Sequence, residues 1–148
     1  MFEIVKKIFS KKAESQNLFD LLGQQKGLTH LVENFYFVME NDAEAKECLN
    51  SHQLVNGKIP DEVKKKLTYF LTGWLGGPQL FLENYGPPRM RARHMHIKIN
   101  AEMGGQWLYC MDKALDKTYP KLSRNNKDDL INSFKAIALR IINSQEGA

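Results

Sequence analysis

The sequence has few of the features that mark secreted or membrane-spanning proteins. It has only two cysteines, Cys48 and Cys110, which lie far apart, so they predict free thiols in a reducing compartment rather than a disulfide framework. No apolar run reaches the roughly 20 residues that a transmembrane helix needs. The first twelve residues alternate apolar side chains with lysines too quickly for a signal peptide. We therefore expect a cytoplasmic protein without stable membrane insertion.

Sequence motifs of common hydrolytic enzymes and nucleotide-binding proteins are also missing. There is no Gly-x-Ser-x-Gly elbow, no glycine loop that cradles phosphate, and no Cys/His pair at an informative spacing. No helix-turn-helix or RNA-binding signature is present, so we do not expect nucleic acid as a partner. Runs of alternating β-branched residues, which would predict strands, are absent as well.

The composition is that of a single soluble domain. The chain has 148 residues, of which 43% are hydrophobic and 26% charged, and its net charge of +4 is only mildly basic. At its start, Phe2, Val5 and Phe9 share one side of a helical wheel and could touch a membrane surface. We interpret this segment more simply as an N-terminal extension, residues 1–16, that packs on the domain.

Helical periodicity runs through nearly all of the remaining chain, which predicts an all-α fold. Asparagines, prolines and glycines mark the ends of about five substantial helices. These run from Asn17 to Gly23, from Lys26 to the "END" at 40–42, from Pro60 to Gly76, from Asn100 to Pro120, and from near Asn126 onward. "QLFLENYG" is expected to be a short apolar turn between the breaks at 76–78 and 87–88.

The stretch "PRMRARHMHIKI", residues 88–99, combines three arginines with two histidines and has three competing interpretations. As a zinc pair, His94 and His96 would diverge by about 200° on a helix, although they would face one way in an extended chain. Two further ligands would be needed, and only His30, His52 and scattered carboxylates are available. A zinc site is therefore disfavoured.

The second interpretation is a basic patch. Arg89, Arg91 and Arg93 stand two residues apart and so do not share one helical face. A carboxylate or phosphate partner stays open, because the guanidinium offers a bidentate fork. In this form the chain would be a non-haem helical interaction module whose arginine-rich stretch docks an acidic partner.

The third interpretation is a cofactor held by one histidine. Tyr36 and Trp107 lie on apolar helical stripes, and each carries a polar group that requires a partner when buried. Two such donors, a neutral imidazole and nearby arginines would suit haem. Iron would take the histidine, the haem carboxylates would take arginine, and the donors would face a bound gas.

Three segments resemble the second group of the truncated haemoglobins: "FYFVMEND", "FLTGWLGGPQLFLENYGPPRMRARHMHIKI" and "WLYCMDKAL". The similarity runs from about Asn17 to Ser144 and implies a truncated globin domain over residues 17–148. It also implies a two-over-two helical sandwich around haem b. The family usually has His where Pro87 stands and often Pro-Phe at His96 and Ile97. Neither is a ligand position in the family.

The resemblance also implies roles for individual residues. His94 matches the proximal iron ligand, and Tyr36 and Trp107 match the distal donors to bound ligand, which are the candidate catalytic residues. His52 matches a variable distal position. Further haem-lining positions fall on Val63, Leu67, Phe70, Leu71 and Trp74. Arg93 is the first candidate for a haem propionate, with Arg91 and Tyr85 as weaker ones.

The implied function is reversible or reactive binding of dioxygen, nitric oxide or peroxide. Two distal donors should slow dioxygen release, which fits poorly with oxygen transport. It fits better with redox detoxification, as nitric oxide dioxygenation or peroxide reduction, served by an unidentified reductase. The protein is expected to be a monomer or homodimer.

Overall fold

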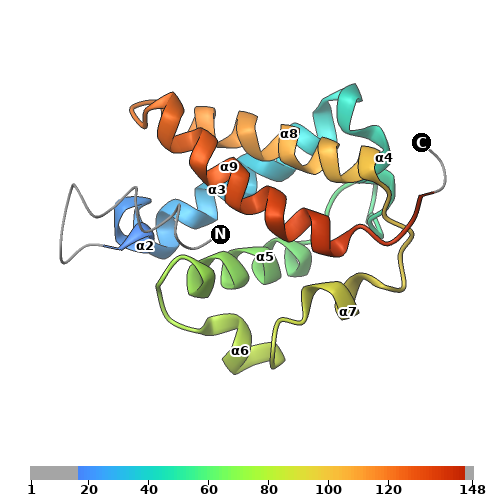
Figure 1. The fold of residues 1–148 in the computed structure, drawn as a ribbon, viewed down its shortest axis with the longest axis horizontal. Coiled ribbons are helices and arrows are strands. Elements are labelled where there is room, and N and C mark those ends of the chain that lie inside the picture. Colours follow the sequence, from blue (N-terminus) through green and yellow to red (C-terminus); the bar gives the residue numbers. More distant parts are fainter. Residues whose placement is uncertain (1–16, 146–148) are drawn as a thin grey trace.

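The computed structural model describes residues 17–145, and within that range every regular element is helical (Figure 1). The proposed extension, residues 1–16, lies outside the described residues. The elements are α2 (Leu18–Leu21), α3 (Gln24–Asn41), the 3-10 helix η1 (Ala43–Ala45), α4 (Lys46–Asn50), α5 (Asp61–Trp74), α6 (Leu80–Tyr85), α7 (Met90–His94), α8 (Ala101–Thr118) and α9 (Arg124–Ile141). None of these helices is long and apolar enough to cross a membrane.

The predicted helix starts are confirmed by their capping hydrogen bonds. The side chain of Asn17 accepts from the Asp20 amide at the start of α2, and that of Asn100 accepts from the Met103 amide at the start of α8. α9 begins slightly earlier than predicted, because the Ser123 side chain takes the cap position. Short polar side chains therefore set these boundaries locally, as the sequence indicated.

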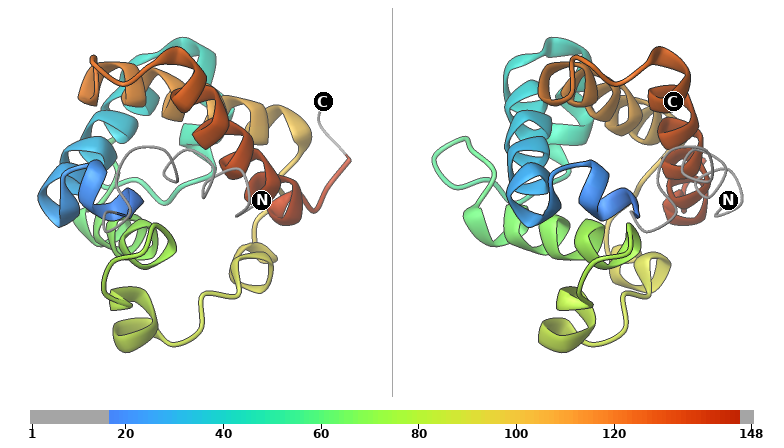
Figure 2. Two further views of the ribbon diagram at one scale, coloured as in Figure 1. Left: turned by 60° about the vertical axis from the view of Figure 1, so that its left-hand side comes forward. Right: turned by 90° about the vertical axis from the view of Figure 1, so that its left-hand side faces the viewer.

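The long helices form two pairs. α3 packs against α5, α8 packs against α9, and α3 also contacts α8, so the pairs are stacked (Figures 1 and 2). This arrangement confirms the expected two-over-two sandwich. The core between the pairs includes the fully buried residues Phe35, Leu31, Met39, Leu71, Met111, Leu115 and Phe134. Truncating one of these to alanine typically costs about 2–5 kcal/mol.

The start of the domain is fastened to the end of α5. The side-chain amide of Asn17 donates to the Gly76 carbonyl over 2.8 Å, and the backbone N–H of Phe19 donates to the Leu75 carbonyl over 3.0 Å. Gly76 has a φ of +102°, a left-handed conformation that glycine adopts without strain. The "GG" after Trp74 therefore ends α5 and turns the chain toward α6.

Two short helices lie where the sequence predicted a turn, in "QLFLENYG", and where it left the conformation open, in "PRMRARHMHIKI". α6 covers "LFLENY" and buries only Phe81, while α7 covers "MRARH" and buries no residue. Proline breaks on either side keep both helices short. The prediction of a simple turn at "QLFLENYG" was therefore wrong, because six of its residues, Leu80–Tyr85, form a helix.

Candidate functional site

His94 is the last residue of α7, and one of its two ring nitrogens is already hydrogen-bonded within the helix. Its Nδ1 lies 2.6 Å from the carbonyl oxygen of Met90, one helical turn earlier. A carbonyl can only accept, so Nδ1 carries the proton and Nε2 keeps its lone pair. Metal-binding histidines are typically oriented in this way by a partner on the other nitrogen. His94 thus has the form required of an axial ligand, whereas His96 is exposed.

Arg93 holds the loop that leads into α7. Its guanidinium donates to the carbonyl of Tyr85 over 2.7 Å and to that of Pro87 over 2.9 Å. It also lies 4.9 Å from the centroid of the Phe81 ring, in cation–π contact. The side chain therefore joins α6 to α7, and any contact with a haem propionate would be added to these bonds.

Arg91 and Tyr85, the weaker candidates for a propionate, each have protein partners. Arg91 donates to the carbonyls of Arg140 and Ile142 at the end of α9, over 2.9 and 3.2 Å. The Tyr85 hydroxyl donates to the Glu62 carboxylate over 2.8 Å. Both bonds of Arg91 come from one guanidinium nitrogen, so Arg91, like Arg93, keeps donors that a propionate could use.

Tyr36 presents a donor without a protein acceptor. It lies on α3, its side chain is 4% exposed, and within residues 17–145 its hydroxyl has no hydrogen-bond partner. Every fully enclosed polar side-chain atom of the described residues does have a partner. The hydroxyl therefore faces open space. Burial, with a smaller effect of the Cys48 thiol, raises the pKa of Tyr36 well above its ordinary value, so it is a neutral donor.

Trp107 reaches the same place from α8. Its ring lies 4.9 Å from that of Phe35, which in turn lies 4.8 Å from the ring of Tyr36. Trp107 is only half-buried, and among the described residues its indole N–H has no acceptor. Phe35 thus separates and supports two unsatisfied donors on neighbouring helices.

His52 completes this side of the site. Its ring lies 5.9 Å from that of Tyr36, nearly perpendicular to it, and its Nδ1 lies 2.9 Å from the Cys48 carbonyl. Burial is the main cause that lowers the pKa of His52 below its ordinary value. The structure therefore places the His52 ring beside Tyr36.

Gln106 is not among the site residues predicted from the sequence. Its side-chain oxygen accepts from the Cys48 amide over 2.8 Å and its nitrogen donates to the Glu47 carboxylate, which fixes α4 and hence His52 against α8. No spacing signal distinguishes this glutamine from a surface residue, because both partners come from a distant part of the chain.

α5 contributes an apolar wall. Val63, Leu67 and Phe70 recur at helical spacing and are half-buried, whereas Leu71 is fully buried on the core side. Phe70 stacks on Trp74 with ring centroids 6.3 Å apart. Half-buried apolar side chains and an imidazole with a free Nε2 suit haem, and two unpaired donors suit a ligand bound to it. The residues present therefore fit the cofactor.

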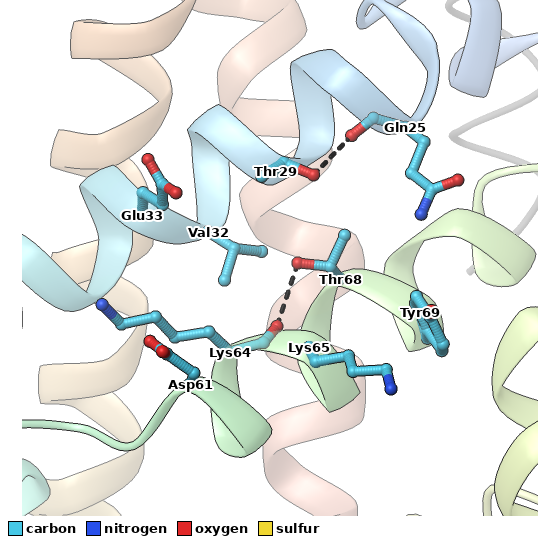
Figure 3. Close-up of a pocket in the computed structure, with 9 residues that line it drawn as sticks. All are labelled: Gln25, Thr29, Val32, Glu33, Asp61, Lys64, Lys65, Thr68 and Tyr69. Carbon is cyan, nitrogen blue, oxygen red and sulfur yellow. Dashed lines mark hydrogen bonds between the residues drawn. The ribbon is translucent and has the colours of Figure 1, made fainter.

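A different pocket, of about 290 Å³, lies on the outer side of α3 and α5 (Figure 3). None of the predicted haem-site residues lines it. Lys64 extends toward Glu33, while Lys65 turns toward Tyr69, with its ammonium 5.5 Å from the ring centroid (Figure 3). Four charged side chains in so small a lining do not suit an apolar porphyrin.

Comparison with known proteins agrees with this geometry. The bacterial-like globin family matches residues 17–143. The chain is 33% identical over 122 residues to the group 2 truncated hemoglobin YjbI of Bacillus subtilis (strain 168), covering 80% of this chain and 83% of that protein. It is 29% identical to the group 2 truncated hemoglobin 3-1 of Lotus japonicus, covering 87% and 73%.

Solved structures show the same fold. The cold-adapted truncated hemoglobin of the Antarctic bacterium Pseudoalteromonas haloplanktis TAC125 superposes with a TM-score of 0.79 at 33% identity, covering 88% of this chain and all of that one. The group II 2-on-2 hemoglobin of Agrobacterium tumefaciens gives 0.80 at 27% identity, covering 91% and 99%. The chain therefore belongs to the bacterial-like globins, as a group II truncated haemoglobin, a haem protein that binds diatomic gases.

Proposed function

We propose that His94 holds the iron of a haem b and that Tyr36 and Trp107 hydrogen-bond the ligand bound to it. The observation that carries this proposal is the pair of donors without acceptors among the described residues, together with a histidine that keeps a free Nε2. The sequence contains no Cys-x-x-Cys-His attachment motif, which supports non-covalent haem b.

Each residue has a distinct part in this scheme. When bound, haem supplies the redox-active iron that coordinates the gas. The Nδ1–H bond to Met90 orients the His94 imidazole and increases its basicity toward iron. The neutral Tyr36 hydroxyl and the Trp107 N–H stabilise negative charge on the outer ligand atom, because both dipoles are held in place before binding. His52 lies beside Tyr36, and Val63, Leu67 and Phe70 exclude water.

The strong distal donors favour redox chemistry over oxygen transport, because they slow dioxygen release. We propose nitric oxide dioxygenation as the leading reaction and peroxide reduction as the second, with Tyr36 and Trp107 as catalytic residues. An unidentified cytoplasmic reductase would return the iron to its ferrous form. We further propose that Arg93 reaches a propionate in addition to its loop contacts.

The test uses haem-loaded protein under dioxygen with a chemical reductant, to which nitric oxide is added. We expect nitric oxide to be converted to nitrate faster than by free hemin, and Tyr36→Phe with Trp107→Phe to remove most of that advantage. A conversion no faster than with hemin would contradict the proposed reaction. Retention of dioxygen in the same samples would still report the binding function separately.

The interaction-module alternative is weakened by the contacts of its own arginines. Arg91 and Arg93 donate to backbone carbonyls of this chain, so of the three arginines only Arg89 has no such bond among the described residues. The family match also identifies the chain as a haem-binding globin. The arginine stretch is therefore better explained as the fastening of α7.

A further inference from the structure

An unbroken series of aromatic contacts leads from the distal donors to the surface beside α6. Trp107 lies 5.5 Å from Phe134, which lies 5.0 Å from Trp74. Trp74 stacks on Phe70 at 6.3 Å, and Phe70 meets Phe81 at 6.3 Å. The series then passes from Phe81 to Tyr85 over 5.0 Å and from Tyr85 to Tyr69 over 6.4 Å.

Core aromatics often touch, so contact alone assigns no function. This series differs because oxidisable rings stand at intervals along it. Tryptophan and tyrosine can each lose one electron far more easily than phenylalanine. Trp107, Trp74 and Tyr85 are thus stations, meaning side chains that can be oxidised and reduced in turn as an electron passes. The phenylalanines between them keep these side chains connected by ring contacts.

The outer end of the series is equipped to lose a proton. The Tyr85 hydroxyl donates to the Glu62 carboxylate over 2.8 Å, and Tyr85 is half-buried. The Lys66 ammonium lies 5.3 Å from the centroid of the same ring. A positive charge on the ring would be repelled by Lys66, so loss of an electron must be accompanied by loss of the phenolic proton. Glu62 is in place to accept it.

We infer that the aromatic series carries single electrons from Tyr85 to the haem site, so that Tyr85 is a surface oxidation site for small one-electron reductants such as phenols. The inference rests on the proposed reaction with peroxide. Reduction of hydrogen peroxide to two waters consumes two electrons and two protons. Each electron leaves Tyr85 while its proton passes to Glu62, which leaves a neutral phenoxyl radical. Exposed Glu62 releases that proton to solvent before the second oxidation, and the peroxide takes up its two protons from solvent. Two phenols then each return a hydrogen atom to Tyr85 and become phenoxyl radicals.

The chain contains a matched control in Tyr109. Its hydroxyl also donates to a carboxylate, that of Asp42, over 2.6 Å, and the Lys113 ammonium lies 5.1 Å from its ring centroid. It is half-buried like Tyr85, but it makes no ring contact with another aromatic residue among the described ones. Tyr85 and Tyr109 therefore differ mainly in their connection to the aromatic series.

The test adds hydrogen peroxide to the haem-loaded protein with a nitroso spin trap and locates the adducts by peptide mass spectrometry. We expect adducts on Tyr85 and Tyr69 but not on Tyr109. Trp74→Phe keeps a ring in the core but removes a station, so the Tyr85 adduct should be lost. Glu62→Gln, on the surface, should also reduce it, while Tyr109→Phe should leave it unchanged.

The inference is overturned if Trp74→Phe and Glu62→Gln both retain the Tyr85 adduct, or if Tyr109 is labelled as strongly as Tyr85. The visible spectrum is recorded in the same samples, so that the electron path and the peroxide reaction are tested separately. A spectrum that responds to peroxide without labelling of Tyr85 contradicts this inference alone. A protein whose spectrum does not respond to peroxide contradicts the proposed peroxide reaction, and it contradicts the electron path as well because that path depends on the reaction.

Discussion

The two sides of the proposed haem site are built in different ways. Tyr36 and Trp107 stand on α3 and α8, each of 18 residues, and Tyr36 and its neighbour Phe35 are buried. His94 stands on α7, a helix of five residues that buries none of them. Packing in the core therefore determines the position of the proposed distal donors, whereas a few hydrogen bonds determine the position of the proposed iron ligand.

This contrast has a functional meaning. Donors that stabilise a bound ligand work best when they are held before the ligand arrives. A ligand on a short, lightly packed helix can adjust to the iron, and the bound haem in turn stabilises the helix that holds it. The first three of the four predictions that follow act on one side of the site while leaving the other as an internal reference; the fourth tests a hydrogen bond of α8.

The largest effect is expected on the histidine side. His94→Ala should abolish stable haem retention, because it removes the proposed axial ligand of the iron. The Soret absorbance per mole of purified protein measures this directly. His96→Ala is the matched control, two residues away and exposed, and should retain haem. Equal haem content in both variants would refute the assignment of His94.

The second effect should appear only on the donor side. Tyr36→Phe or Trp107→Phe should speed dioxygen dissociation by roughly 10- to 100-fold, because a hydrogen bond to a charged acceptor is worth about 1.5–3 kcal/mol. Stopped-flow displacement of dioxygen measures the rate. Haem retention should be unaffected in both variants. Unchanged dissociation rates in both would remove their assigned role.

A smaller change is expected when the attachment of α7 is loosened. Arg93→Ala removes the bonds to the Tyr85 and Pro87 carbonyls, and haem transfer to an acceptor globin should become roughly three- to tenfold faster. Amide exchange should increase in α7 but not in α3. Arg89→Ala serves as the control. Faster exchange throughout the molecule would argue against two sides of different rigidity.

The smallest effect concerns pH and the donor side. The Tyr109 hydroxyl bonds Asp42, and this bond lowers the pKa of Asp42 below its ordinary 3.8. The contribution to stability is therefore complete above 3.8 and is lost as the pH falls through the lower folded value. Tyr109→Phe should reduce the difference in unfolding free energy between pH 7 and pH 3, measured with urea. An identical difference in both proteins would show that the bond does not contribute.

The sequence predicted best the parts of the fold that depend on local signals. Asn17 and Asn100 were recognisable as caps, and the apolar stripes of the long helices were regular enough to define their faces. The site residues themselves came from the resemblance to the truncated haemoglobins. Periodicity alone left His94 and His96 equivalent.

What the sequence could not predict depends on long-range backbone contacts. Arg93 and Arg91 looked alike, yet one fastens α6 to α7 and the other reaches α9. The acceptors are backbone carbonyl groups, which every residue has, so no pattern of side chains predicts which of them an arginine will contact. α6 was misjudged for a related reason, because a helix of six residues has too few turns to show a period.

Asn143, which follows α9, joins the end of that helix to the segment after α7. Its side chain donates to the carbonyls of His94 and Ile97 and accepts from the Ile99 amide, while Arg91 grips the last turn of α9. His94 and the residues that follow α9 are thereby tethered to each other. Any displacement of α7 would therefore be resisted by this segment, whose own position depends on the packing of α9 against α8.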